Sequence, residues 1–349
     1  MKSFQIITFI GLWAVSITAC SEKKETPVPT TPVTTTPTTT PPVIDPITPK
    51  PTVSFFNDPV MKKANLVSLS FADDQTLFAL GNDDAKGYLF KSTDSGKTWS
   101  EVSINGSNPI MRSVNFKDEK IGVLSGKNVL GTTDGGATWQ AISRPTDATQ
   151  ASYPKNQEGF VLKQFYDNFH SREYTELHYV NTSNLAQTKY ETLFGYMSDV
   201  HFLKGKIGML VGTYGLIYVI NIQVDGSYEY IDPVRPVTEV LHSVFLVSDK
   251  KAFVGGKNST FLKTIDGGEN WTILKTGVTG NVMKLAFQNE NLGYSIIENE
   301  GKTSLYKIEN SGVKWTKIET PDTAVFNDLR INSVGKAIAV GKAGAVYLF

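Results

Sequence analysis

Cysteine is almost absent from this 349-residue sequence, because Cys20 is the only one. A lone cysteine cannot form an internal disulfide, so Cys20 is either a spare thiol or a site of attachment. Net charge is absent too: 34 Lys and Arg balance 34 Asp and Glu. This balance argues against nucleic acid or a strongly anionic surface as the main partner.

Residues for metal and cofactor chemistry are also scarce. The sequence holds four histidines, which show no zinc-type spacing with one another or with cysteine, and we predict no metal site. No glycine-rich phosphate loop follows a strand and opens a helix, so we expect no nucleotide and no cofactor. The only long apolar run lies at the N-terminus.

That run extends from Phe4 to Ala19 behind Lys2. It is too short to cross a hydrocarbon core of about 30 Å comfortably and ends in small residues, which is typical of a secretory signal peptide. Its end, Ile17-Thr18-Ala19-Cys20, resembles the lipobox of bacterial lipoproteins. This resemblance implies a lipid on Cys20 that anchors the chain to a membrane. By the same analogy Ser21 indicates the outer membrane, with the periplasmic and cell-surface faces both left open.

Residues 26–52 follow as a Pro/Thr-rich stretch, in which 20 of 27 residues are Pro or Thr. Such a segment cannot bury enough apolar surface to fold and favours extended polyproline conformations. At roughly 3.1 Å per residue it forms a stalk of up to about 80 Å. We therefore predict a signal peptide at 1–19, a lipidated cysteine and stalk at 20–52, and a folded domain at 53–349.

One pattern recurs in the folded domain: a hydroxyl residue, then Asp two positions later, Gly after two more and Trp after three more. It occurs at residues 92–99, 132–139 and 264–271. Asp accepts hydrogen bonds from its own turn, Gly supplies a positive φ, and Trp offers a large apolar body to bury. The residues that match are Asp94, Gly96, Trp99, Asp134, Gly136, Trp139, Asp266, Gly268 and Trp271.

This turn resembles the Asp-box, or BNR repeat, of sialidases, sortilin-type receptors and related propellers, and in that reading it is structural. Asp94 and Asp134 are 40 residues apart, and degenerate copies at Asp225 and Asn310 keep a similar period. Short strand patterns separated by turn residues fill each period, so we predict an all-β propeller of four-stranded blades. The count is most consistent with seven blades, with six as the alternative.

Two blades need further assumptions. The long interval between Asp134 and Asp225 requires a third blade with an eroded box near Asn184, where Tyr190 replaces Trp. The last unit ends at Phe349 before its fourth strand, and we predict that residues 52–56 supply it beside residues 346–349. Residues 160–179 are rich in aromatics, which fits either a wide blade core or an exposed loop that contacts a partner.

Three V-G-containing steps, at residues 211–215, 254–257 and 340–344, resemble those of photosystem II assembly-factor-like propellers. Proteins of that family act as assembly scaffolds, and the resemblance implies a similar role here. A sialidase needs an arginine cluster, whereas this chain has five arginines and no Arg-Ile-Pro signature. A glycosidase needs two facing carboxylates, and Asp199 with Asp328 is the candidate pair. Solvated rim residues are the alternative interpretation of that pair.

Alignment of the innermost strands places polar side chains of both signs in two adjacent registers. Since successive residues alternate faces, one register should point to the central channel and its mouth. The candidate partner-contact residues are Arg112, Asp199, His242, Lys284 and Asp328. We therefore predict no catalytic residues and a lipid-anchored scaffold for an unknown protein or glycan, with a glycan-active enzyme as the alternative.

Overall fold

The computed structural model describes residues 54–57, 59–104, 109–142, 147–155, 158–181, 186–203, 207–223, 227–321 and 323–349. The predicted signal peptide, Cys20 and the Pro/Thr-rich stretch lie outside these residues, and what we predict for them stays a prediction. Among the described residues, no helix has both the length and the apolar character needed to cross a membrane.

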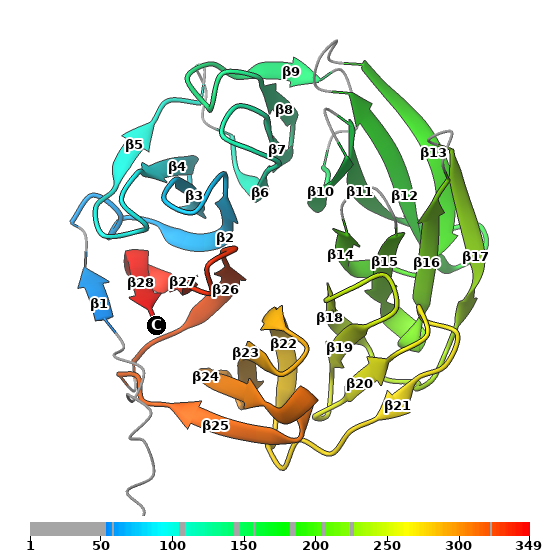
Figure 1. Ribbon diagram of the computed structural model, residues 1–349. Coiled ribbons are helices and arrows are strands. Elements are labelled where there is room, and N and C mark those ends of the chain that lie inside the picture. The colour runs from blue at the N-terminus through cyan, green and yellow to red at the C-terminus, as the bar shows by residue number, and fades with distance from the viewer. Residues whose placement is uncertain are drawn as a thin grey trace, which may run out of the picture. The chain divides into compact units, whose positions relative to one another are not determined.

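Seven four-stranded antiparallel sheets form a ring, each sheet being one blade (Figure 1). The fold is therefore a seven-bladed β-propeller, as the repeat period predicted, and the count of seven rather than six is confirmed. Within each of the first six blades the strands follow one another outward from the axis of the ring in chain order.

The first four blades contain 16 of the strands. The first has β2 (Asn65–Phe71), β3 (Leu77–Asn82), β4 (Gly87–Ser92) and β5 (Ser100–Val102). The second has β6 (Met111–Phe116), β7 (Gly122–Gly126), β8 (Val129–Thr132) and β9 (Gln140–Ile142). The third has β10 (Gln150–Lys155), β11 (Glu158–Asp167), β12 (Arg172–Asn181) and β13 (Ala186–Phe194). The fourth has β14 (Met197–Leu203), β15 (Ile207–Gly212), β16 (Ile217–Ile222) and β17 (Tyr228–Val234).

The remaining strands complete three more blades. The fifth has β18 (Leu241–Leu246), β19 (Ala252–Gly256), β20 (Phe261–Thr264) and β21 (Thr272–Ile273). The sixth has β22 (Asn281–Asn289), β23 (Leu292–Asn299), β24 (Lys302–Glu309) and β25 (Lys314–Ile318). The seventh joins β26 (Phe326–Ile331), β27 (Ala337–Gly341) and β28 (Ala345–Leu348) to β1 (Ser54–Asn57). Short 3-10 turns occupy Thr213–Gly215, Asn310–Gly312 and Lys342–Gly344.

The N-terminal strand closes the ring. β1 pairs antiparallel with β28, from Ser54 opposite Leu348 to Asn57 opposite Ala345. The predicted closure is confirmed, although the strand begins at Ser54, and Thr52 and Val53 lie outside the described residues. The open edge that β28 would otherwise present is thereby covered.

The hydrophobic core consists of layers between neighbouring blades. Each of seven clusters of buried apolar residues joins one blade to the next, including the layer between the last blade and the first. The second strand of a blade is packed on both faces, so β7, β15, β19 and β27 are buried along their whole length. The outermost strands, such as β5 and β21, are short and largely exposed.

The repeated turns explain the regular spacing. Asp94 Oδ1 accepts the backbone N–H groups of Lys97 and Thr98 at 3.0 and 2.9 Å, and the Trp99 indole donates to the Gly96 carbonyl at 3.0 Å. Gly96 has φ +85°. Ser95 then donates its N–H to the Gln75 carbonyl at 2.8 Å, which joins the turn to the loop after the innermost strand. Equivalent hydrogen bonds occur at Asp134 and Asp266.

Candidate functional site

The seven innermost strands surround the axis of the ring, and six of them share one irregularity. A single residue of each strand bulges out near the start of its pairing with the next strand, after the first pair in four strands and after the second pair in β2 and β22. The bulged residues are Val67, Arg112, Ser198, His242, Met283 and Asn327. Simple alternation of faces, which we assumed for the two registers, therefore fails at this point.

The residues just after the bulge connect neighbouring blades. The N–H of Leu69 donates to Asp328 Oδ2 at 2.8 Å, that of Val244 to Asp199 Oδ2 at 3.0 Å, and that of Leu285 to Ser243 Oγ at 3.1 Å. An innermost strand has no strand on its axial side, so these N–H groups need acceptors from elsewhere. Side chains of the preceding blade supply them. We call this set of contacts the inter-blade belt.

Asp328 is part of this belt and is only 1% exposed. Its Oδ1 accepts the N–H of Leu329 at 2.9 Å and lies 3.3 Å from the guanidinium of Arg330. The interpretation of Asp328 as a solvated rim residue is therefore wrong, and its role as a partner contact stays a prediction that its burial does not favour. The reason is that the bulge turns the residue after it toward the neighbouring blade and away from solvent.

Asp199 is likewise buried, at 5% exposure, so it is not a solvated rim residue either. Its carboxylate accepts hydrogen bonds from the Gln150 side-chain amide at 2.5 Å and from the Ser243 hydroxyl and Val244 N–H at 3.0 Å each. Burial alone would raise the pKa of Asp199, but the charges of Lys284 and Arg330, with these hydrogen bonds, hold it below its usual value. The carboxylate is therefore ionised and occupied as an acceptor.

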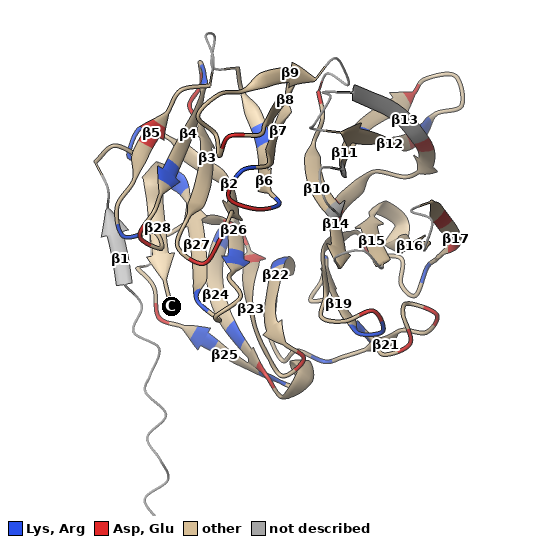
Figure 2. Cartoon of the chain, turned by 45° about the horizontal axis from the view of Figure 1, so that its top comes forward, with Lys and Arg blue, Asp and Glu red and all other residues tan. Residues whose placement is uncertain are grey.

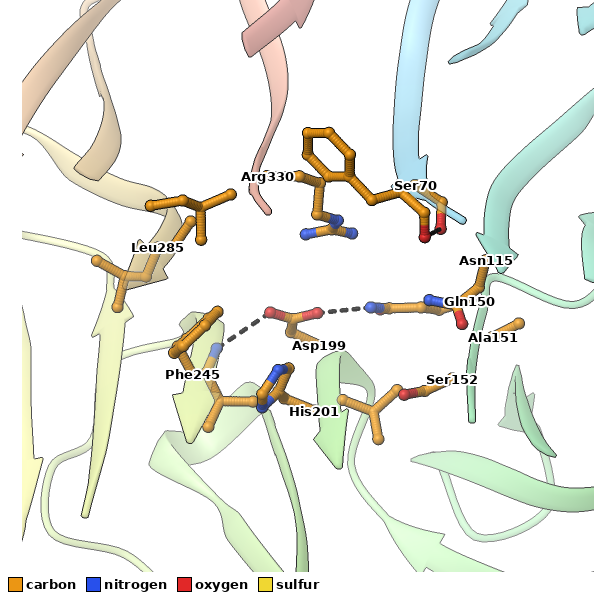
Figure 3. A pocket seen from close by; sticks show the side chains of 15 residues that line it. Ser70, Asn115, Gln150, Ala151, Ser152, Asp199, His201, Phe245, Leu285 and Arg330 are labelled. Atoms are coloured by element: carbon orange, nitrogen blue, oxygen red, sulfur yellow. Dashed lines mark hydrogen bonds between the residues drawn. The ribbon is translucent and has the colours of Figure 1, made fainter. Parts of the chain in front are cut away.

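An axial cavity of about 250 Å³ lies beside Asp199 and is lined by residues from all seven innermost strands. In Figure 3 the guanidinium of Arg330 points from above toward the carboxylate of Asp199, the side chain of Gln150 reaches that carboxylate from the side, and His201 lies below it. The Arg330 guanidinium donates from Nε to the Leu69 carbonyl at 3.0 Å. Most of the lining is small polar or apolar side chains.

Sequence reasoning missed Arg330 and His201. Each follows a belt residue by two positions on its strand, so the same alternation that selected Asp199 and Asp328 could have found them. His201 Nδ1 accepts the N–H of Leu246 at 3.1 Å, and its ring stacks on Phe245 at 4.5 Å. Burial lowers the pKa of His201 to about 4 and outweighs the negative charge of Asp199, which raises it. The ring is neutral at physiological pH.

Three other predicted contact residues lie where the innermost strands begin, and we call Arg112, His242 and Lys284 the axial mouth. Arg112 is exposed and donates to the Asp147 carbonyl at 3.3 Å, while His242 and Lys284 are partly buried. Burial and the positive charges of Lys284 and Lys257 lower the pKa of His242. Lys284 makes no hydrogen bond or ion pair within the described residues.

Elsewhere on the ring, charges of both signs alternate along the strands and loops (Figure 2). Arg112 and Lys284 lie at the axial mouth, while the nearby carboxylates of Asp199 and Asp328 are buried in the belt. Within the part of the chain that the structure describes, no group of three His, Cys, Asp or Glu side chains is placed to hold a metal ion.

The aromatic stretch of the third blade is partly buried in the core and partly exposed, and contact with a partner there stays a prediction. Phe160 and Tyr179 pack in the layer between the third and fourth blades. Tyr166 and Phe169 lie near or at the tip of the β11–β12 hairpin and are 50% and 90% exposed. The base of the hairpin therefore belongs to the hydrophobic core, whereas its tip exposes aromatic side chains to solvent.

Comparison with known proteins identifies similar folds but no family. No protein-family description matches the sequence, and no curated protein matches it. Solved structures do match. The structure of YCF48 bound to a D1 peptide has a TM-score of 0.67 and 17% identity, over 85% of this chain and 96% of the other. YCF48 from Cyanidioschyzon merolae gives 0.65 and 13%, over 85% and 98%.

The likeness is one of fold. The WD40 propeller domain of Doa1 matches almost as well, with a TM-score of 0.60 at 10% identity over 82% of this chain and 92% of the other. At such identities the shared feature is the propeller.

Proposed function

We propose that this chain is a non-catalytic binding scaffold, anchored at the outer membrane by a lipid on Cys20, that binds a protein partner at the axial mouth. The observation that carries the proposal is the state of the charges around the axis. The carboxylates of Asp199 and Asp328 are used by the inter-blade belt, while the cations of Arg112 and Lys284 lack ion pairs in the described chain. A mouth of this kind is complementary to an acidic segment.

The glycosidase alternative requires one carboxylic acid held protonated and a second carboxylate facing it. Asp199 has a lowered pKa, and Asp328 does not line the cavity. This pair therefore supplies neither the acid nor a free base. A protein partner is further supported by the YCF48 neighbour, which was solved with a D1 peptide bound to the same fold.

The test compares full-length chains in the membranes of the cells that express them. Proteins crosslinked to the wild type are quantified against an Arg112→Glu/Lys284→Glu variant and against a Lys97→Glu control. Lys97 is exposed in a turn that packs on the loop after the innermost strand, at the end of the ring opposite the axial mouth. We expect at least one partner that the control retains and the double variant loses by tenfold or more, which corresponds to about 1.4 kcal/mol.

Partners that persist equally on all three chains, or no specific partner at all, would refute binding at the axial mouth. The anchor is tested separately by radiolabelled palmitate. Incorporation into the wild type that is lost in Cys20→Ser, with release of that variant from the membrane fraction, is the expected result. A wild-type chain that takes up no label would remove the lipid from the proposal.

A further inference from the structure

The hairpin of the third blade extends beyond its innermost strand. The pairing of β10 with β11 ends at Gln150 opposite Leu162, and β11 continues for five more residues to Asp167. In the other six blades the second strand ends at, or one residue past, its last pair with the innermost strand. Among the described residues, the end of β11 therefore pairs with a strand only on its outer side, where β12 lies.

The backbone groups on the axial side of this extension can be assigned from the hydrogen bonds around it. Thr149 donates its N–H to the Leu162 carbonyl, so the backbone groups of Leu162 point toward the axis. Because these groups alternate along a strand, those of Gln164 and Tyr166 point the same way. Within the described chain neither residue has a backbone hydrogen bond on that side.

Both faces of this open edge carry aromatic side chains. Phe165 stacks on Tyr174 across the hairpin at 5.5 Å, and Tyr174 meets Phe194 edge-on at 6.1 Å. Tyr166, the next residue, points to the opposite face of the sheet and is half exposed. A strand that paired with the edge would thus place its side chains against an aromatic surface on either face.

We propose that the extended end of β11, residues 163–167, is a docking edge for an extended segment of a protein partner, which adds to the third blade as a further strand. The inference rests on the proposed binding function and specifies its mode. Two N–H and C=O pairs spaced about 7 Å apart match the backbone of a β-strand and no other common ligand. The backbone groups of the edge would bind the backbone of the partner segment, and the aromatic faces would bind its apolar side chains.

The position of the edge fits the proposed interface. Arg112 of the axial mouth donates to the carbonyl of Asp147, which lies three residues before β10, so mouth and edge are at the same end of the ring. An extended segment on β11 would continue toward the cationic side chains of the mouth. The chain's own residues 26–52 are a poor occupant, because their many prolines lack the N–H that strand pairing requires.

The test uses the full-length chain and a displayed library of random ten-residue peptides. Selected peptides are measured on wild type, Tyr166→Pro and Tyr166→Val. The proline removes the axial N–H, which takes no part in pairing with β12, and the valine removes the same ring but keeps the N–H. We expect tenfold or greater loss of affinity with proline and no more than about threefold with valine, since one hydrogen bond contributes about 1 kcal/mol or more.

A second measurement needs no variant. Amide hydrogen exchange of Gln164 and Tyr166 should be fast in the free chain and slow with peptide bound, whereas Phe165, which pairs with β12, stays protected throughout. Equal losses with proline and valine would indicate ring stacking, as for a glycan, and would overturn the proposal. So would peptides insensitive to both variants, unchanged exchange of the two amides, or a library without binders.

The outcomes also separate this inference from the proposed function. Loss of the cellular partner with Arg112→Glu/Lys284→Glu but not with Tyr166→Pro leaves binding at the axial mouth intact and removes the strand addition. Loss with both variants supports both statements.

Discussion

At the residue scale, aspartate serves mainly as a backbone acceptor in this protein. In the turns, the backbone and side chain of Asn270 donate to Asp266, and these hydrogen bonds lower its pKa to about 2. In the inter-blade belt, Asp199 and Asp328 accept N–H groups from the next blade. An ionised carboxylate suits both tasks because it accepts several hydrogen bonds and donates none. His201 performs the same task with a neutral ring.

His201 makes stability depend on pH. Its pKa of about 4 in the folded chain lies below the unfolded value of 6.5, so the unfolded chain binds more protons between these limits. Stability should be complete above pH 6.5 and fall by up to about 1.4 kcal/mol per pH unit toward pH 4. Urea unfolding from pH 4 to 8 measures this slope, to which His242, with its lowered pKa, also contributes.

A His201→Gln variant should show a shallower slope over that range, because glutamine does not titrate. Identical slopes for His201→Gln and the wild type would show that His201 titrates normally in the folded chain.

At the element scale, each blade has a buried inside and an exposed outside. Phenylalanines at the end of innermost strands lie over a glycine at the start of the next, as in Phe202 over Gly208 and Phe287 over Gly293. A Cβ on either glycine would come within 2.5 Å of the ring, so the close approach requires glycine. β1 differs from all other strands because it arrives from the far end of the chain to complete a blade.

Removal of β1 should weaken the ring. A chain that begins at residue 59 loses the four pairs between β1 and β28, and we expect unfolding free energy to fall by about 2–4 kcal/mol. Size-exclusion chromatography should also show aggregates, since the edge of β28 is then open. The control begins at residue 50 and keeps β1. Equal stability of the two chains in urea would mean that β1 does not help to close the ring.

At the scale of the whole molecule, stability is distributed around a closed circle. Seven apolar layers join neighbouring blades, and the belt adds polar contacts between the innermost strands. The contact of Asp328 with Leu69 joins the last blade to the first, across 259 residues of sequence. It acts together with β1, which joins the same blade from its outer edge.

Asp328→Ala should therefore be strongly destabilising. It leaves the Leu69 N–H without an acceptor and Arg330 without its carboxylate, and we expect a loss of about 3–5 kcal/mol. Asp328→Asn keeps one oxygen acceptor and should lose less. Asp232→Ala, at an exposed position, should stay within about 0.5 kcal/mol of the wild type. Denaturant midpoints rank the three variants by stability. An Asp328→Ala variant as stable as the wild type would contradict a structural role for the belt.

The sequence by itself determined the propeller and the strand that closes it, and it favoured seven blades over six. These features depend on local chemistry that repeats: the turn around Asp94, Asp134 and Asp266 forms from hydrogen bonds within a few residues, and its period counts the blades. The missing strand after Phe349 followed from that count. A regular pattern of short-range interactions can be read from sequence because no distant partner is needed to produce it.

Only the tertiary structure decided what lies around the axis. The bulge in the innermost strands breaks the alternation of faces just before Asp328, which lies buried between blades. The partners of Asp199 are Gln150 on the preceding blade and Val244 on the next. The extension of β11 became visible only against the end of β10. Each of these features depends on how one strand meets another, and the strand alone does not contain that information.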